Sequence, residues 1–305
     1  MTPGSALVSG FVSGFVRELL RGLAQIMLQP APLVGALFFA GFLLNSSLLS
    51  LLALLGCGVA TVMARICGCD VAERQAGLYG FNGALVGLTL GYFYQASILI
   101  WVLVILGGMA STLVMREMLR RHLRPLTFPF ILVSWLIMSL LWLGGWSEST
   151  VGIEVNPDQI RVLDGLLRAF GQVMFQENLV TGAVFLGAII LTNRVAGFFA
   201  LLGAGLSVAV VSIASLTDLG EIFPVEAVNL GLFGYNAVLC GIVFAGWSLK
   251  NLGAALLAIV LSILFVRLFQ LVALPALTFP FVLASWLVFW LQAKSGTYKP
   301  RRGKN

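Results

Sequence analysis

Two threonines, Thr127 and Thr278, each lie in the pentapeptide LTFPF, which occurs twice in this chain and is followed both times by Ser-Trp-Leu. Their hydroxyls can donate or accept a hydrogen bond, and the nearby prolines remove a backbone donor. Two glutamines, Gln25 and Gln172, also lie in apolar surroundings. Inside hydrocarbon such groups need partners, so they bind a neighbouring helix or face a solute path. As symmetric pairs they favour the lining of a pore.

The composition indicates the environment in which these polar groups lie. Hydrophobic residues make up 60% of the 305 positions and charged residues 10%, with a mean hydropathy of +1.03. A soluble domain has about 25% charged residues. Several uncharged stretches, including Pro32–Leu55 and Ala96–Met115, reach the length of about 20 residues that crosses a bilayer. We therefore predict an all-α polytopic membrane protein.

The charges predict a topology. Residues 294–305 contain five basic side chains, whereas residues 148–160 contain three acidic ones and no base. By the positive-inside bias, the C-terminal tail faces the cytoplasm and the central linker faces the other side. A topology signal explains the tail better than binding to anionic lipid or nucleic acid, so no nucleic-acid partner is expected.

Neither a leader nor a metal site is expected. No basic residue precedes the first apolar stretch, so a cleavable signal peptide is not predicted. Cys67-Gly68-Cys69 has no second pair and no histidine nearby, which favours buried or interfacial thiols. No cofactor is expected.

The chain contains an internal duplication. Three blocks of similar sequence recur in the same order at offsets of 147, 154 and 151 residues. They are Arg21–Gln29 with Arg168–Gln176, Gly80–Gly87 with Gly234–Gly241, and Leu126–Leu136 with Leu277–Leu287. We predict a first transmembrane repeat over residues 1–147, an extracytoplasmic linker over 148–160, a second repeat over 161–293 and a basic tail over 294–305.

The two repeats are expected to be inverted. Each half, at about 130 residues, has room for five full crossings and one shorter segment. Five is odd, so the second copy would enter the membrane upside down. Repeats of this kind commonly form a transport path at their interface.

Proline and glycine mark where the helices are interrupted. Pro129 and Pro280 predict a helix that begins near each LTFPF. The glycine-rich blocks predict close helix packing, in which Asn82 and Asn236 can bond to freed backbone groups. The i, i+4 pairs Phe81 with Leu85, and Tyr235 with Leu239, belong on one helical face each, either as core or as pore wall.

These motifs resemble those of the bacterial urea transporter family, whose signature is Leu-Pro-x-x-Thr-x-Pro-Phe. The second half matches it throughout, with Leu274, Pro275, Thr278, Pro280 and Phe281. The first half matches with Leu123, Thr127, Pro129 and Phe130 but has Arg124 in place of the first proline. Pro125 follows directly, which allows the turn to be shifted by one residue. The likeness covers roughly Arg17 to Gln292.

The resemblance implies two inverted repeats of five transmembrane helices and one half-spanning re-entrant helix each, with a pore at the repeat interface. It implies a homotrimer in the bacterial inner membrane, in contact with lipid, that carries urea down its gradient. It places acceptors at Gln25 and Gln172 and the central constriction at Thr127 and Thr278. The slot walls would then be Phe81, Leu85, Tyr235, Leu239 and Phe175, with Leu28 where the family often has an aromatic residue.

The chemistry of urea fits such a slot. Urea is planar and neutral, so apolar walls suit its faces and a row of oxygens replaces the hydrogen bonds it loses to water. An ion would lose too much hydration in the same slot.

Three other functions fit the sequence less well than a urea pore. An ion-coupled transporter for a small neutral amide would carry acids at membrane depth, but Glu177 has Pro30 as its repeat mate. An ammonia channel is expected to have paired histidines, and this chain has only His122. The Ser, His and acidic residues form no recognisable catalytic grouping, so an enzyme is not predicted.

Overall fold

A computed structural model describes residues 3–148, 160–214, 217, 223–272 and 275–295, with side chains described from residue 12 onward. Most of the predicted linker, the tail beyond Ser295 and the motif residue Leu274 therefore lie outside the described residues. Within the described part of the chain every regular element is an α-helix. This agrees with the predicted all-α class.

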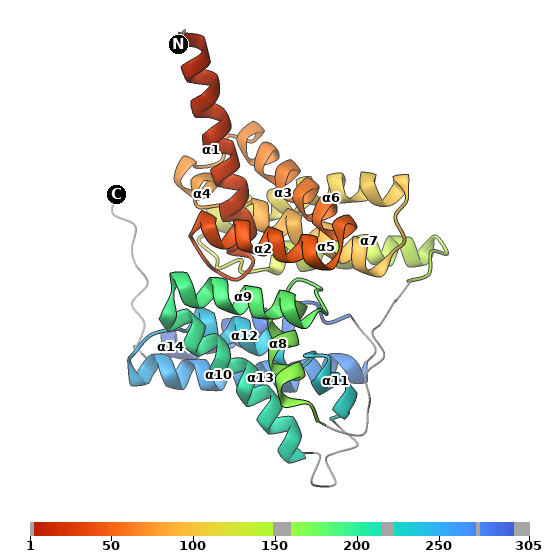
Figure 1. Ribbon diagram of the computed structural model, residues 1–305, viewed down its shortest axis with the longest axis vertical. Coiled ribbons are helices and arrows are strands. Elements are labelled where there is room, and N and C mark those ends of the chain that lie inside the picture. The colour runs from red at the N-terminus through yellow and green to blue at the C-terminus, as the bar shows by residue number, and fades with distance from the viewer. Residues whose placement is uncertain (1–2, 149–159, 215–216, 218–222, 273–274, 296–305) are drawn as a thin grey trace.

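Fourteen helices form two sets of seven within the described residues. The first set is α1 (Pro3–Gln25), α2 (Pro32–Asn45), α3 (Ser47–Ile66), α4 (Val71–Gln75), α5 (Gly80–Phe93), α6 (Ile98–Arg120) and α7 (Phe128–Leu143). The second set is α8 (Val162–Gln172), α9 (Leu179–Thr192), α10 (Arg194–Ala214), α11 (Val225–Asn229), α12 (Gly234–Val243), α13 (Leu249–Leu271) and α14 (Phe279–Lys294). Figure 1 shows α1–α7 as one layer and α8–α14 as a second layer beneath it.

Among the described residues, four helices are long and apolar enough to cross a membrane: α3, α6, α10 and α13. The described parts of α2, α5, α7, α9, α12 and α14 span 10 to 16 residues. At 1.5 Å per residue these reach at most about 24 Å, less than the ~30 Å hydrocarbon core. Five full crossings in each half therefore remain a prediction.

The helix starts follow from local sequence. Pro129 and Pro280 lie in the first turns of α7 and α14, where proline has no hydrogen bond to lose. Ser97 and Ser248 cap α6 and α13 by accepting a hydrogen bond from the backbone N–H of the residue three positions later. The prediction that a helix begins at each LTFPF is confirmed.

The backbone has unusual conformations at corresponding places in the two halves. Positive φ angles occur at Leu28 and Phe175, at Gly77 and Gly231, and at Leu126 and Leu277. These pairs are separated by 147, 154 and 151 residues, the offsets that relate the repeated sequence blocks. The repeated blocks therefore share turn geometry as well as sequence.

The glycine-rich blocks pack closely against other helices. A Cβ on Gly87 would lie 2.2 Å from the carbonyl oxygen of Leu52, and one on Gly241 would lie 2.1 Å from that of Phe199. Each glycine thus brings α5 against α3, or α12 against α10, at backbone contact. The interpretation of these blocks as closely packed helices is confirmed.

The two halves contact each other through α2 with α9 and through α7 with α14. Phe38 and Phe185, 147 positions apart, pack edge to face with ring centroids 4.9 Å apart. Thr181 donates a hydrogen bond from its hydroxyl to the carbonyl oxygen of Gly41 at 3.2 Å. The candidate site lies at the α7–α14 part of this interface.

Candidate functional site

The two repeated threonines meet at the interface of the halves. The hydroxyl oxygens of Thr127 and Thr278 are 2.6 Å apart, and the residues are 2% and 3% exposed. Each threonine follows a leucine of positive φ and immediately precedes α7 or α14. Two polar turns from distant parts of the chain therefore share one buried hydrogen bond.

Two tryptophans, one in each half, donate hydrogen bonds to the loop that precedes α14 or α7 in the other half. Trp135 donates its indole N–H to the carbonyl oxygen of Pro275, and Trp286 donates to that of Arg124, each at 2.8 Å. Donors and acceptors are both 151 positions apart, so the two bonds are equivalent. Arg124 thus occupies the place of Pro275, and the one-residue shift that Pro125 allowed does not occur. The Arg124 guanidinium lies 3.9 Å from the ring centre of Phe289.

The paired asparagines satisfy the first turns of α7 and α14. Asn82 accepts a hydrogen bond from the backbone N–H of Phe130 at 3.1 Å, and Asn236 accepts one from Phe281 at 3.0 Å. The first N–H groups of a helix have no partner within the helix. The predicted role of the asparagines, to bond freed backbone groups, is confirmed.

Gln25 and Gln172 are the last residues of α1 and α8. Gln25 donates its amide N–H to the carbonyl oxygen of Ala76 at 3.0 Å, so its oxygen is the group that can accept from a solute. Three residues on, Leu28 and Phe175 turn the chain at positive φ toward α2 and α9. Each glutamine therefore lies where a helix ends.

A cavity of about 240 Å³ adjoins the threonine pair. Four predicted site residues line it: Gln172, Phe175, Tyr235 and Thr278. Its other lining residues are Tyr92, Phe93, Val173, Leu232 and Pro275–Leu277. The Tyr235 hydroxyl donates to the carbonyl oxygen of Leu277 at 2.7 Å, so this ring is held in place. The cavity combines aromatic walls with hydroxyl and amide groups.

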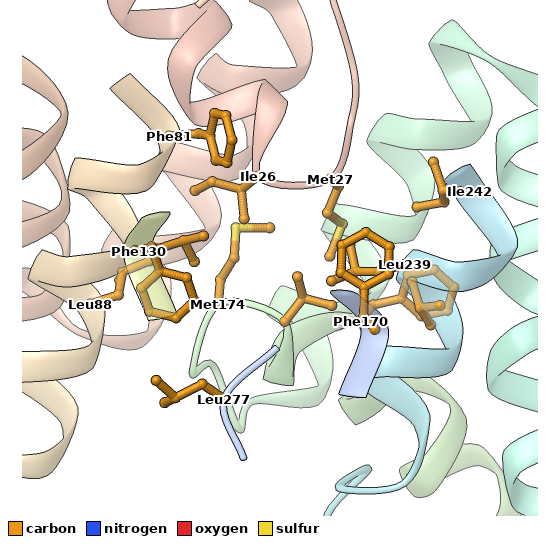
Figure 2. Close-up of a cluster of buried hydrophobic side chains, with 14 of the residues drawn as sticks. Ile26, Met27, Phe81, Leu88, Phe130, Phe170, Met174, Leu239, Ile242 and Leu277 are labelled. Atoms are coloured by element: carbon orange, nitrogen blue, oxygen red, sulfur yellow. The ribbon is translucent and has the colours of Figure 1, made fainter. Parts of the chain in front are cut away.

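The other predicted residues do not line this cavity. Leu85 and Leu239 are fully buried and Phe81 is 5% exposed. Figure 2 places Phe81 and Leu239 in a cluster of apolar side chains that also contains Met27 and Phe130. Gln25, Leu28 and Thr127 come from the corresponding segments of the first half. A role of these residues as pore walls stays a prediction.

The repeated sequence blocks did not assign three neighbouring residues to the site: the aromatic Tyr92 and Phe93 and the acidic Glu177. Tyr92 donates its hydroxyl hydrogen to a Glu177 carboxylate oxygen at 2.5 Å. Glu177 has Pro30 as its mate, and α5 runs to Phe93 whereas α12 ends at Val243. A search for repeated residues cannot detect site residues whose mate in the other half is absent or of a different type. The run of aromatic residues in GYFYQ, residues 91–95, was the sequence feature that could have indicated an aromatic wall here.

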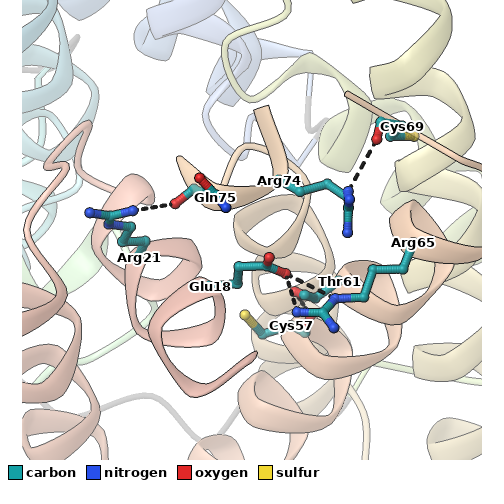
Figure 3. Close-up of polar contacts among 8 residues, drawn as sticks. All are labelled: Glu18, Arg21, Cys57, Thr61, Arg65, Cys69, Arg74 and Gln75. Carbon is teal, nitrogen blue, oxygen red and sulfur yellow. Dashed lines mark hydrogen bonds and ion pairs between the residues drawn. The ribbon is translucent and has the colours of Figure 1, made fainter. Parts of the chain in front are cut away.

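A polar cluster holds α1 against α3 and α4 (Figure 3). Glu18 and Arg65 form an ion pair at 2.9 Å, and Arg21 donates to the carbonyl oxygen of Gln75 at 2.7 Å. In the second half, Arg168 corresponds to Arg21 and Asn229 to Gln75, and Arg168 likewise donates to the carbonyl oxygen of Asn229 at 3.1 Å. These arginines anchor the helices that end at Gln25 and Gln172. Among the described residues no three His, Cys, Asp or Glu side chains form a metal-binding group.

The fold and this buried polar interface define a helical membrane protein with similar halves and a polar, aromatic-walled cavity between them. A family model described as "Urea transporter" matches residues 16–293. Urea transporter 1 of Capra hircus is 27% identical over 303 residues, covering 90% of this chain and 77% of that protein. Urea transporter 1 of Mus musculus is 28% identical over 304 residues, covering 91% and 77%. The chain belongs to the urea transporter family.

Proposed function

We propose that this protein carries urea passively across a membrane, as a transport protein and not as an enzyme. The observation that carries the proposal is the family match over residues 16–293. That range contains both LTFPF turns, the threonine pair and the lining of the 240 Å³ cavity.

The lining of the cavity suits urea chemically. Phe175, Tyr235 and Tyr92 offer apolar faces to a flat solute, while Gln172 and Thr278 offer polar groups. A urea molecule that leaves water loses hydrogen bonds, and each unpaired polar group in an apolar site costs about 1–3 kcal/mol. Acceptors along the path replace those bonds, and they must hold urea weakly enough to release it.

The threonine pair supports a central step on the path. A hydroxyl donates one hydrogen bond and accepts others, so Thr127 and Thr278 can exchange their mutual bond for bonds to urea. Passage past this point then replaces one hydrogen bond with others and leaves no polar group unpaired. In this proposal Gln25, Leu28, Phe81 and Leu85 continue the path in the first half, and Leu239 belongs to its wall in the second half.

The proposal includes the finer architecture. It comprises two inverted repeats, each with five crossings and a re-entrant helix, in a homotrimer in a bacterial inner membrane. The turn positions shared by the two halves support the repeats. The arginines at the end of α6, Arg116, Arg120 and Arg121, support a cytoplasmic face opposite the acidic linker. The homotrimer and the bacterial membrane rest on the motif resemblance.

Flux measurements on proteoliposomes test the proposal. Urea should enter faster than into empty liposomes, without a proton or sodium gradient and without a change in membrane potential. Water and ammonia are measured in the same preparation. Urea flux that depends on an ion gradient would favour a coupled transporter, and ammonia flux without urea flux would favour an ammonia channel.

A further inference from the structure

Two cavities meet at a pair of aromatic side chains. Beside the 240 Å³ cavity lies a second cavity of about 560 Å³, which we term the vestibule. Its lining includes Asn45, Tyr92, Phe175 and Glu177. Tyr92 and Phe175 line both cavities, with ring centroids 5.2 Å apart. These two rings therefore form the partition between the vestibule and the inner cavity.

Glu177 determines where the Tyr92 ring lies. The 2.5 Å hydrogen bond from the Tyr92 hydroxyl to the Glu177 carboxylate links the end of α5 to the turn before α9. That turn is itself held, because Arg168 donates to the Glu177 carbonyl oxygen at 3.1 Å and Asn45 donates to the Gln176 side chain at 2.8 Å. A hydrogen bond to a charged acceptor is stronger than a neutral one. The ring is thus fixed at its far end by a rigid acceptor.

Among the described residues, the first and second halves do not repeat this arrangement. Glu177 corresponds to Pro30, which has no side-chain acceptor. Tyr92 lies between Asn82 and the capping residue Ser97. Equivalent residues of the two halves differ by 154 positions at Asn82 and Asn236, but by only 151 positions at Ser97 and Ser248. The first half therefore has three extra residues there. The partition is therefore an asymmetric feature of a duplicated framework.

We propose that Tyr92 and Phe175 select solutes by size at this mouth of the path, and that Glu177 is the positioning residue for Tyr92. The inference rests on the proposed urea transport and deepens it. A ring held at its hydroxyl cannot rotate aside, so a solute must fit past both rings as they stand. Urea is small and flat, whereas a methyl group on nitrogen adds width. Loss of the hydroxyl anchor frees the Tyr92 ring and lets wider solutes pass.

The test compares urea with N-methylurea in the same proteoliposomes. The flux ratio of the two solutes does not depend on how much protein has folded, so a merely structural defect leaves it unchanged. Tyr92→Phe keeps the ring and removes the anchor, and should lower the urea-to-methylurea ratio about threefold, as expected for one hydrogen bond. Glu177→Ala should lower it equally, and the double variant no further. Glu177→Gln keeps an acceptor and should restore part of the ratio.

A matched control exists elsewhere in the chain. Tyr79 donates its hydroxyl hydrogen to Glu73, also at 2.5 Å, and lines neither cavity. Tyr79→Phe and Glu73→Ala should therefore keep the wild-type ratio. An unchanged ratio in Tyr92→Phe and Glu177→Ala, with normal urea flux in the wild type, would overturn this inference alone. Absence of urea flux in the wild type would overturn the proposed function and the inference with it.

Discussion

At the scale of single residues, the central feature is one hydrogen bond between Thr127 and Thr278, buried where the halves meet. Removal of one partner leaves the other hydroxyl unpaired, which costs about 1–3 kcal/mol, whereas replacing both with apolar groups of the same shape can be nearly neutral. Valine has almost the shape of threonine. The effects of the pair on stability and on transport can therefore be separated.

We expect Thr278→Val to slow urea flux several-fold and to lower the thermal unfolding temperature. The double variant Thr127→Val/Thr278→Val should recover stability, because no hydroxyl remains unpaired, but should stay slow. Stopped-flow urea flux and thermal unfolding in detergent measure the two effects. Thr192→Val, whose hydroxyl bonds only within α9, is the control and should keep full flux. Full flux in the double variant would remove the threonines from the path.

At the scale of elements, the framework consists of helices that end inside the protein and turns that are closed by side chains. Buried Gln29 donates to the carbonyl oxygen of Met27 at 2.9 Å, and Gln176 donates to that of Met174 at 2.7 Å. These bonds close the turns after α1 and α8. Where no side chain fits, glycine replaces it: a Cβ on Gly231, which has φ of +74°, would lie 2.5 Å from the backbone nitrogen of Ala169.

Gly231→Ala should destabilise the protein, because it forces a positive φ that costs an L-residue about 1–2 kcal/mol and also creates a backbone clash. We expect a lower unfolding temperature and a lower yield of folded protein by size-exclusion chromatography. Gly187→Ala is the control, since a Cβ there meets no atom within 4 Å and alanine favours the helix by up to about 1 kcal/mol. Equal stability of the two variants would contradict the inferred role of the turn.

At the scale of the whole molecule, several of the contacts that join the halves are symmetric. The tryptophan bonds from Trp135 and Trp286, the threonine pair and the contact of α2 with α9 all relate equivalent positions. A framework of this kind places the ends of α7 and α14 in equivalent positions of the two repeats. If the repeats are inverted, those ends face opposite sides of the membrane.

Cysteine labelling tests this topology. With Cys67 replaced by serine, Trp146→Cys after α7 should react with a membrane-impermeant maleimide from the extracytoplasmic side of oriented vesicles. Lys294→Cys at the end of α14 should react only from the cytoplasmic side. Both positions are solvent-exposed. Labelling of both from the same side would rule out the inverted arrangement.

The sequence by itself determined the class of protein, the duplication, the helix starts at Pro129 and Pro280, and the bonding role of Asn82 and Asn236. These features are local or repeated. A proline affects the backbone of its own turn, and a duplicated block can be recognised by its similarity to the other copy. Hydropathy depends on composition alone, so the membrane class also follows without any contact being known.

Only the tertiary structure decided which side chains share a space. It brought Gln172, Phe175, Tyr235 and Thr278 to one cavity and buried Leu85 and Leu239 outside the lining of that cavity. It also paired Tyr92 with Glu177, whose repeat mate Pro30 has no side-chain acceptor. The physical reason is that which way a residue faces and what it meets depend on how whole helices pack, over separations such as the 151 residues between the threonines.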